Sequence, residues 1–168
     1  DEWWRGGRRV DDWAFGLVDA NRRPKPALPA VTQVFVEAPF SPSERARRPS
    51  VSVVVCAYNA VDTIDDCLTS LEALTYPRTQ LIVINDGSRD ATAAIARRHS
   101  GVQVVDLLNG GLSAARNAGL AAATGEIVAY TDADCRVDPD WLTYLVQPLV
   151  RSDAVGVGGP NVVPADDP

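Results

Sequence analysis

Residues 125–134 read Gly-Glu-Ile-Val-Ala-Tyr-Thr-Asp-Ala-Asp, a short apolar run that ends on two carboxylates. The run from Ile127 to Tyr130 is typical of a buried strand. Asp132 and Asp134 follow at once, so this strand would place negative charge at the carboxyl edge of a sheet. Such charge is costly unless it is solvated or neutralised, and a divalent cation is one way to neutralise it. The stretch therefore predicts a buried strand with a cation site at its tip.

The Asp-x-Asp spacing is weak evidence when it stands alone. The chain has 17 Asp residues, and Asp138-Pro139-Asp140 repeats the spacing. We interpret that second copy as the start of a helix, with Asp138 as N-cap, Pro139 as first helical residue and Asp140 as a first-turn acid. The copy at 132–134 gains its weight from the residues that precede it.

Strand and helix patterns alternate from residue 51 onward. We predict strands at 51–57, 81–84, 102–105, 127–130 and 154–157. Helical patterns lie between them, at 62–74 with Asp62 as cap, at 91–98, at 113–123 with Ser113 as cap, and at 139–150. Parallel strands need crossover helices, so the alternation predicts an α/β fold with a mainly parallel, Rossmann-like sheet and helices on both faces.

Ligands in such sheets bind beyond the carboxyl ends of the strands, where the strand order reverses. If the four predicted strands have the order 3-2-1-4, the reversal falls between the first and the fourth. The loops 57–59 and 132–134 then face one crevice, with Asp86 one strand further along. Three polar clusters at three strand ends form the predicted site.

Composition excludes several classes of protein. The net charge of −6 and a pI of about 4.7 argue against a nucleic-acid partner. Cys56, Cys67 and Cys135 have no CxxC spacing, which favours a reducing compartment over a disulfide framework or a zinc site. We interpret His99 as a solvated helix cap. No apolar run approaches 18 residues and no signal peptide is evident, so we expect no membrane span in this chain.

The amino-terminal residues differ from the rest. Residues 12–19, Asp-Trp-Ala-Phe-Gly-Leu-Val-Asp, followed by Arg-Pro-Lys-Pro-Ala, resemble the last strand and helix of (β/α)8 glycoside hydrolases; a loosely packed extension is the alternative. Residues 27–35 are an apolar stretch with helical character. We expect a remnant of a preceding domain at 1–36, a linker at 37–49, and part of a further, α/β domain at 50–168. The lack of any Met suggests an excerpt of a longer protein.

Four motifs in one order carry a second resemblance. They read Val-Ser-Val-Val-Val-Cys-Ala-Tyr-Asn at 51–59, Leu-Ile-Val-Ile-Asn-Asp-Gly-Ser at 81–88, Gly-Gly-Leu-Ser-Ala-Ala-Arg-Asn-Ala-Gly at 110–119, and Thr-Gly-Glu-Ile-Val-Ala-Tyr-Thr-Asp-Ala-Asp at 124–134. In this order they resemble the family 2 inverting glycosyltransferases with the GT-A fold. The resemblance spans roughly residues 50–168.

The resemblance implies roles for the first two motifs. Residues such as Ala57, Tyr58 and Asn59 line the base and ribose pocket in this family. Asp86 matches the acid that hydrogen-bonds the nucleobase, usually uracil. Asn85 stands where the family commonly has another Asp, which is a departure from its pattern.

The resemblance also implies roles for the last two motifs. Arg116 and Asn117 match the helix that borders the donor site. Asp132, Ala133 and Asp134 match the segment that binds the ribose and, through Asp134, a Mg²⁺ or Mn²⁺ on the diphosphate. A separate carboxylate serves as the base for the acceptor, and we expect it beyond Pro168.

The implied activity is the transfer of a sugar, with inversion, from a nucleoside-diphosphate sugar to a hydroxyl group of a glycan or lipid-linked acceptor. The expected nucleotide is UDP. We expect a role in polysaccharide, glycolipid or cell-envelope glycan synthesis, in the cytoplasm at the inner face of the plasma membrane, with membrane association through parts outside this chain. A nucleotidyltransferase would want Gly, Lys or Arg in the loop at 57–61, and a dehydrogenase would want G-x-G-x-x-G there; both patterns are absent. A non-catalytic nucleotide-binding module of the same fold remains open.

Overall fold

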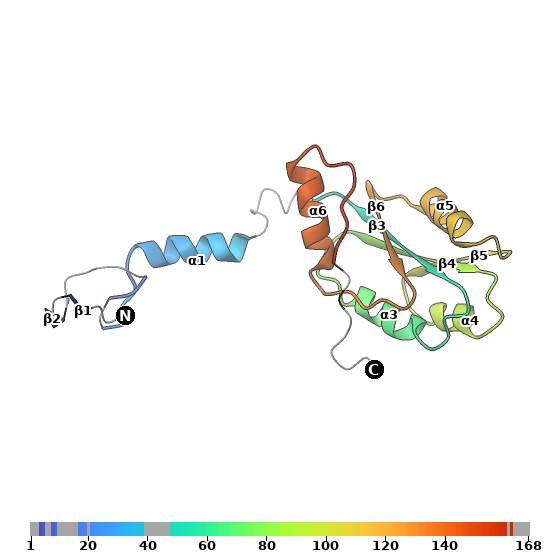
Figure 1. Cartoon of the computed structure of the whole chain (residues 1–168), viewed down its shortest axis with the longest axis horizontal. Coiled ribbons are helices and arrows are strands. Elements are labelled where there is room, and N and C mark those ends of the chain that lie inside the picture. Colours follow the sequence, from blue (N-terminus) through green and yellow to red (C-terminus); the bar gives the residue numbers. More distant parts are fainter. Residues whose placement is uncertain are drawn as a thin grey trace. The chain divides into compact units, whose positions relative to one another are not determined.

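The computed structural model describes residues 4–5, 8–9, 17–19, 21–38, 48–160 and 162. The chain divides into two compact units, 1–46 and 47–168 (Figure 1). In the first unit, β1 (Trp4–Arg5) pairs antiparallel with β2 (Arg8–Arg9). Helix α1 (Ala27–Glu37) confirms the helix expected at 27–35. Most of the expected linker at 37–49 lies outside the described residues.

The second unit is built on a four-stranded parallel sheet. Its strands are β3 (Val51–Ala57), β4 (Thr79–Asp86), β5 (Val102–Leu107) and β6 (Ile127–Asp132). Their order is β5-β4-β3-β6, and each neighbouring pair is parallel. The predicted order 3-2-1-4 is therefore confirmed, and with it the α/β class.

Helices cover both faces of this sheet. They are α3 (Ile64–Glu72), α4 (Thr92–Ala96), α5 (Leu112–Ala122) and α6 (Trp141–Arg151). Side chains of α3, α4 and α6 share one core cluster with Val53 and Val55 of β3. Ala115 of α5 packs with Val54 and Ile82 in a second cluster on the opposite face. Figure 1 shows α3 and α4 on one side of the strands and α5 on the other.

The central strand β3 is buried along almost its whole length, as its β-branched run predicts. Gly119 lets α5 approach this strand closely. A Cβ at position 119 would lie 2.2 Å from Cγ1 of Val54, a distance at which something must shift. The glycine therefore sets how near α5 lies to the sheet, and α5 carries two of the predicted site residues.

The prediction of a fifth strand at 154–157 is wrong. Residues 152–160 have no helix or strand, and Val155 is fully exposed. A strand needs a partner for its backbone groups, and within the described residues both edges of the sheet are left without a further strand. An apolar run of four residues is thus not sufficient to make a strand.

The predicted helix starts are also wrong by one to two residues. Thr63, not Asp62, precedes α3, and Gly111, not Ser113, precedes α5 at a φ of 85°. Helix α6 begins at Trp141 because Asp138 forms a turn before it, in which its carboxylate accepts from the backbone N–H of Asp140 at 2.8 Å. Local hydrogen bonds of this kind compete with the first helical turn.

The prediction that His99 is a solvated cap is wrong. Its side chain is 10% exposed and lies between two carboxylates of α3. Nε2 is 3.2 Å from Oδ1 of Asp65, and Nδ1 is 3.2 Å from Oε1 of Glu72. The ring thus ties the end of α4 to α3.

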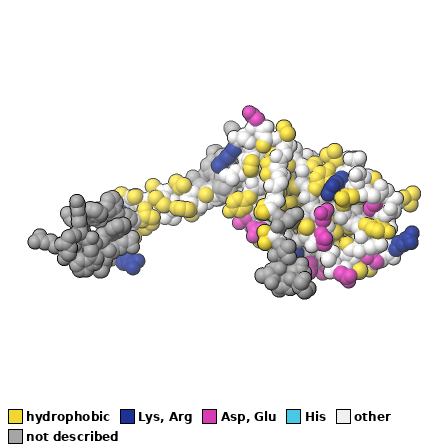
Figure 2. Space-filling view, viewed as in Figure 1, with side chains coloured by type: hydrophobic (Ala, Val, Ile, Leu, Met, Phe, Trp, Pro, Cys, Tyr) yellow, Lys and Arg dark blue, Asp and Glu magenta, His cyan; other side chains and the backbone are white. Residues whose placement is uncertain are grey.

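On the face of the second unit shown in Figure 2, acidic and basic side chains are interspersed with apolar ones. Among the described residues, no helix has the length and apolar character that crossing a bilayer requires.

Candidate functional site

The predicted acids lie at one edge of the sheet. β4 ends at Asp86 and β6 ends at Asp132, and both strands run parallel to β3 between them. Cys56 pairs with Asp132 on one side and with Ile84 on the other. Side chains alternate along strands, so Cys56, Asp86 and Asp132 all belong to the face that α5 covers. The prediction that the strands bearing these acids end at a single carboxyl edge is confirmed.

Asp86 is held by the loop that leads into α5. Its side chain is 5% exposed, and its Oδ1 and Oδ2 accept from the backbone N–H groups of Gly110 and Gly111, each at 2.8 Å. Asn109 Nδ2 donates to the Asp86 carbonyl at 3.1 Å. A carboxylate has about four acceptor sites, so this one keeps capacity for a further donor. The loop therefore fixes the orientation of the Asp86 carboxylate and leaves part of its hydrogen-bond acceptor capacity free.

A cation from α5 faces the acid at the end of β6. Arg116 NH2 is 3.9 Å from Asp132 Oδ1, and both side chains are about half exposed. The Tyr130 hydroxyl donates to the Arg116 carbonyl at 3.2 Å, which joins α5 to β6. An ion pair this exposed is weak, so the guanidinium can turn toward a substrate phosphate. Asn117, the next residue of α5, is exposed.

Cys56 lies among these charged groups. Burial raises the pKa of its thiol, the Arg116 guanidinium opposes the rise, and the carboxylates of Asp132 and Asp86 add to it. The sequence analysis treated this cysteine only as a small buried side chain. The pairing of position 56 with position 132 across parallel strands could have revealed its place, once the strand order was accepted.

The loop after β3 is tied to the loop after β4. Asn59 has a φ of 50°, its N–H donates to Ser88 Oγ at 3.0 Å, and its side-chain oxygen accepts from Arg89 N at 2.9 Å. Tyr58 beside it is half exposed, whereas the Ala57 side chain is buried in the core. Tyr58 thus offers a ring to a ligand, and Ala57 can offer only backbone atoms.

The segment at 132–135, which we name the acid turn, is a β-turn. Cys135 N donates to the Asp132 carbonyl at 3.2 Å and closes it. Ala133 at its centre is 6% exposed and packs in the core, whereas Asp134 is exposed. The Asp134 carboxylate accepts from Cys135 Sγ at 3.7 Å. The turn therefore buries its alanine and presents its second acid to solvent.

The acidic side chains at this edge suit a cation that is bound partly by the protein and partly by a substrate. Among the described residues, no group of three or more His, Cys, Asp and Glu side chains is arranged to bind a metal ion. Mg²⁺ commonly uses one or two carboxylates plus substrate phosphates, not a cage made by protein alone. The acid turn carries two such carboxylates, Asp132 and Asp134, and both are exposed.

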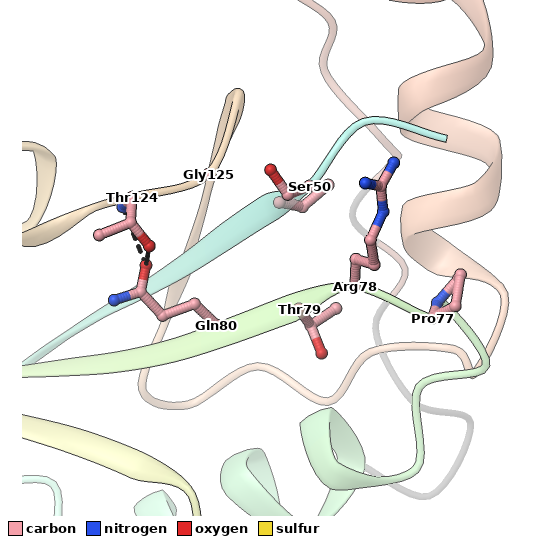
Figure 3. Close-up of a pocket in the computed structure, with 8 residues that line it drawn as sticks. Ser50, Pro77, Arg78, Thr79, Gln80, Thr124 and Gly125 are labelled. Carbon is pink, nitrogen blue, oxygen red and sulfur yellow. Dashed lines mark hydrogen bonds between the residues drawn. The ribbon is translucent and has the colours of Figure 1, made fainter. Parts of the chain in front are cut away.

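A cavity of about 320 Å³ lies at the other end of the sheet. It is lined by residues at the amino ends of β3 and β4 and before β6, among them Ser50, Thr79 and Thr124 (Figure 3). Gln80 there accepts hydrogen bonds from both the backbone and the hydroxyl of Thr124. This cavity is at the edge opposite the acids and does not belong to the candidate site.

Comparison with known proteins shows the family. Residues 52–168 match glycosyl transferase family 2, and the chain belongs to this family. It is 33% identical over 126 residues to a poly-beta-1,6-N-acetyl-D-glucosamine synthase of Staphylococcus epidermidis, a match that covers 71% of this chain and 31% of that protein.

Two solved structures share the fold. The mannosyltransferase PcManGT of Pyrobaculum calidifontis, in complex with GDP-Man and Mn²⁺, matches with a TM-score of 0.58 at 33% identity, over 61% of this chain and 33% of that one. The glucosyl-3-phosphoglycerate synthase of Mycobacterium tuberculosis, with Mn²⁺, UDP and glucosyl-3-phosphoglycerate, matches with a TM-score of 0.57 at 29% identity, over 66% of this chain and 43% of that one. The chain thus spans less than half the length of these relatives.

Proposed function

We propose that residues 50–168 form the donor-binding part of a glycosyltransferase that transfers a sugar from a UDP-sugar to an acceptor hydroxyl with inversion. The observation that carries this proposal is that Asp86 and Asp132 end the parallel strands on either side of β3, at one carboxyl edge of the sheet, with Asp134 in the turn after β6. Family membership and relatives solved with nucleotides and Mn²⁺ support it.

The nucleobase binds at Asp86. The uracil ring carries an imide N–H, and the Asp86 carboxylate is oriented by two backbone donors while it keeps room for a third. Tyr58 offers an exposed ring beside the base, and Asn59 holds the loop that carries this ring. Backbone atoms of Ala57 complete this wall, since its side chain is buried.

The ribose and diphosphate bind at the acid turn. Asp132 accepts from the ribose hydroxyls, the backbone of Ala133 borders them, and Asp134 ligates a Mg²⁺ or Mn²⁺. Arg116 leaves its exposed pair with Asp132 to meet the diphosphate, and Asn117 lies beside it on α5. A bound divalent cation would stabilise the charge that develops on the leaving diphosphate.

The acceptor is a glycan or a lipid-linked glycan. The similarity to a poly-beta-1,6-N-acetyl-D-glucosamine synthase supports a glycan-building role. A hydroxyl acceptor must lose its proton as the sugar is transferred, so a carboxylate base outside the three acids above completes the reaction.

Calorimetry of the full chain tests the proposal. We expect UDP to bind, Mn²⁺ to strengthen binding at least about ten-fold, and Asp134→Ala to remove the Mn²⁺ effect while metal-free UDP binding persists. Asp153→Ala is the matched control, because Asp153 is an exposed acid with no hydrogen bond or ion pair in the described structure. Failure of the wild-type chain to bind UDP, GDP or a UDP-sugar would contradict the proposal and favour a structural role for the fold.

A further inference from the structure

The acid turn and the residues after it are fastened to helix α3. Arg136 forms an ion pair with Asp66 of α3. Further along, Thr75 donates its N–H to the Pro139 carbonyl at 2.9 Å and its hydroxyl to Asp140 Oδ1 at 2.7 Å. The segment 132–140 is therefore tied both to α3 and to the loop that follows this helix.

The innermost of these contacts involves Ser70. Its hydroxyl accepts from the backbone N–H of Val137 at 3.1 Å and donates to the Cys67 carbonyl at 2.7 Å. The Ser70 hydroxyl is thus both a donor and an acceptor. Its bond to the Cys67 carbonyl of the same helix fixes its orientation. The Val137 side chain packs against the core beneath it.

Cys67 makes a parallel contact one helical turn away. Its Sγ lies 3.6 Å from the Asp132 carbonyl, the same oxygen that accepts from Cys135 N to close the acid turn. The Cys67 side chain is fully buried. One helix face therefore touches both ends of the segment that carries Asp134.

We propose that Ser70 is a positioning residue that holds the metal-binding acid turn in place from behind. The inference rests on the proposed function, because it assigns the turn to the cation and the diphosphate. Ala133 and Val137 anchor the two ends of the segment by packing against the core, and the Ser70 bond to Val137 N adds a partly buried polar contact at one end, as the Cys67 Sγ contact to the Asp132 carbonyl does at the other.

The physical reason is preorganisation. Asp134 is exposed, and its carboxylate accepts a weak hydrogen bond from Cys135 Sγ, so within the described part of the chain little fixes this side chain directly. Its position depends on the backbone of the turn, which Ser70 and the core hold still. A site whose supporting shell is loosened loses affinity even when every ligand is still present.

Ser70→Ala leaves Val137 N without its partner in a partly buried layer. The loss of one such hydrogen bond corresponds to about five-fold weaker Mn²⁺ binding in the presence of UDP. Uridine lacks the diphosphate and reports only on the nucleobase end, so its affinity should stay within about two-fold of wild type. Ser70→Thr keeps a hydroxyl that can bond back to the helix, and we expect it to restore Mn²⁺ affinity.

The experiment measures Mn²⁺, UDP and uridine binding by calorimetry on the full chain, well below the unfolding temperature of each variant. Thr69→Ala is the matched control, because Thr69 is the exposed neighbour on the same helix and makes no contact in the described structure. Amide hydrogen exchange at 132–137, measured without ligand, gives a second readout. We expect faster exchange there in Ser70→Ala and unchanged exchange in Thr69→Ala.

The outcomes separate this inference from the proposed function. If wild type binds UDP and Mn²⁺ but Ser70→Ala binds Mn²⁺ equally well, the positioning role is wrong and the proposed function stands. Equal weakening of uridine and Mn²⁺ binding would also overturn it, because that result marks general damage. If wild type binds no nucleotide, the proposed function is wrong. In that case, amide exchange rates at 132–137 that are equal in Ser70→Ala and wild type would overturn the positioning role as well.

Discussion

Replacing Asn85 with Asp should strongly destabilise the fold. Asn85 is 6% exposed, and its Nδ2 donates to Asp106 Oδ1 at 2.9 Å. Its side-chain oxygen accepts from Ser88 N at 3.2 Å. In Asn85→Asp the donor becomes a carboxylate that faces the Asp106 carboxylate at hydrogen-bond distance.

Two effects set the magnitude of this loss. A hydrogen bond to a charged group is worth about 1.5–3 kcal/mol. Repulsion of two carboxylates at this distance adds a few kcal/mol at an effective dielectric constant of about 20. Asp106 is half exposed and paired with Arg97, so solvent and that pair screen much of the repulsion. We therefore expect a loss of about 3 kcal/mol at pH 7, and a smaller loss at acidic pH, where protonation of the introduced carboxyl restores a hydrogen bond.

Urea unfolding at the two pH values measures this prediction. The double variant Asn85→Asp with Asp106→Asn rebuilds the pair with its roles exchanged, and it should recover at least half of the lost stability. The lost ion pair to Arg97 costs little, because it is exposed. Wild-type stability in Asn85→Asp, or a double variant no more stable than that single one, would refute the reasoning.

Three further predictions concern packing and charge. Gly119→Ala should destabilise the fold by about 1–3 kcal/mol in urea unfolding, because its Cβ would overlap Val54 at 2.2 Å. His99→Ala should cost about 1–2 kcal/mol by the same assay, since it removes the ring between two carboxylates of α3. Hydrogen bonds from Ser50 lower the pKa of Glu126 from 4.5. The hydrogen bonds to the Glu126 carboxylate therefore stabilise the fold above pH 4.5, and this stabilisation is lost as the pH falls through the lowered pKa. Urea unfolding of Glu126→Gln and of wild type at pH 7 and pH 3 measures it.

Each of these predictions has its own contrary result. The Gly119→Ala prediction is contradicted if the added substitution Val54→Ala, which removes the atoms that the new Cβ would overlap, recovers no stability. For His99→Ala the contrary result is a stability equal to that of wild type at neutral pH. For Glu126→Gln it is a difference from wild type that grows, instead of shrinking, as the pH falls.

The α/β class and the strand order could be predicted from the sequence because both follow from simple rules. Buried parallel strands read as continuous apolar runs, and the run at 51–57 is of this kind. The run at 127–130 does form a strand, but the prediction that this strand is buried is wrong, because β6 lies at the edge of the described sheet and its side chains are partly buried or exposed. The acids at 86 and 132 follow their strands directly, so parallel pairing alone brings them to one edge. The strand predicted at 154–157 failed because a strand depends on a partner that a short apolar run does not supply.

The supporting contacts could not be predicted, because they join residues far apart in the sequence. Ser70 meets Val137, His99 meets Asp65, and neither pair has a local signature. The close hold of Gly110 and Gly111 on Asp86 likewise depends on how the loop before α5 returns to β4. The resemblance of residues 12–19 to a barrel end stays a prediction, since most of these residues lie outside those described.

The central claim is that acids at the carboxyl ends of β4 and β6, on either side of β3, bind a nucleotide and its cation together. A crystal of the full chain grown with UDP and Mn²⁺ tests it directly through the anomalous signal of manganese. The account predicts a manganese peak about 2 Å from an Asp134 carboxylate oxygen, with the uracil at Asp86. A peak at the opposite edge of the sheet, or a uridine bound away from Asp86, would contradict it.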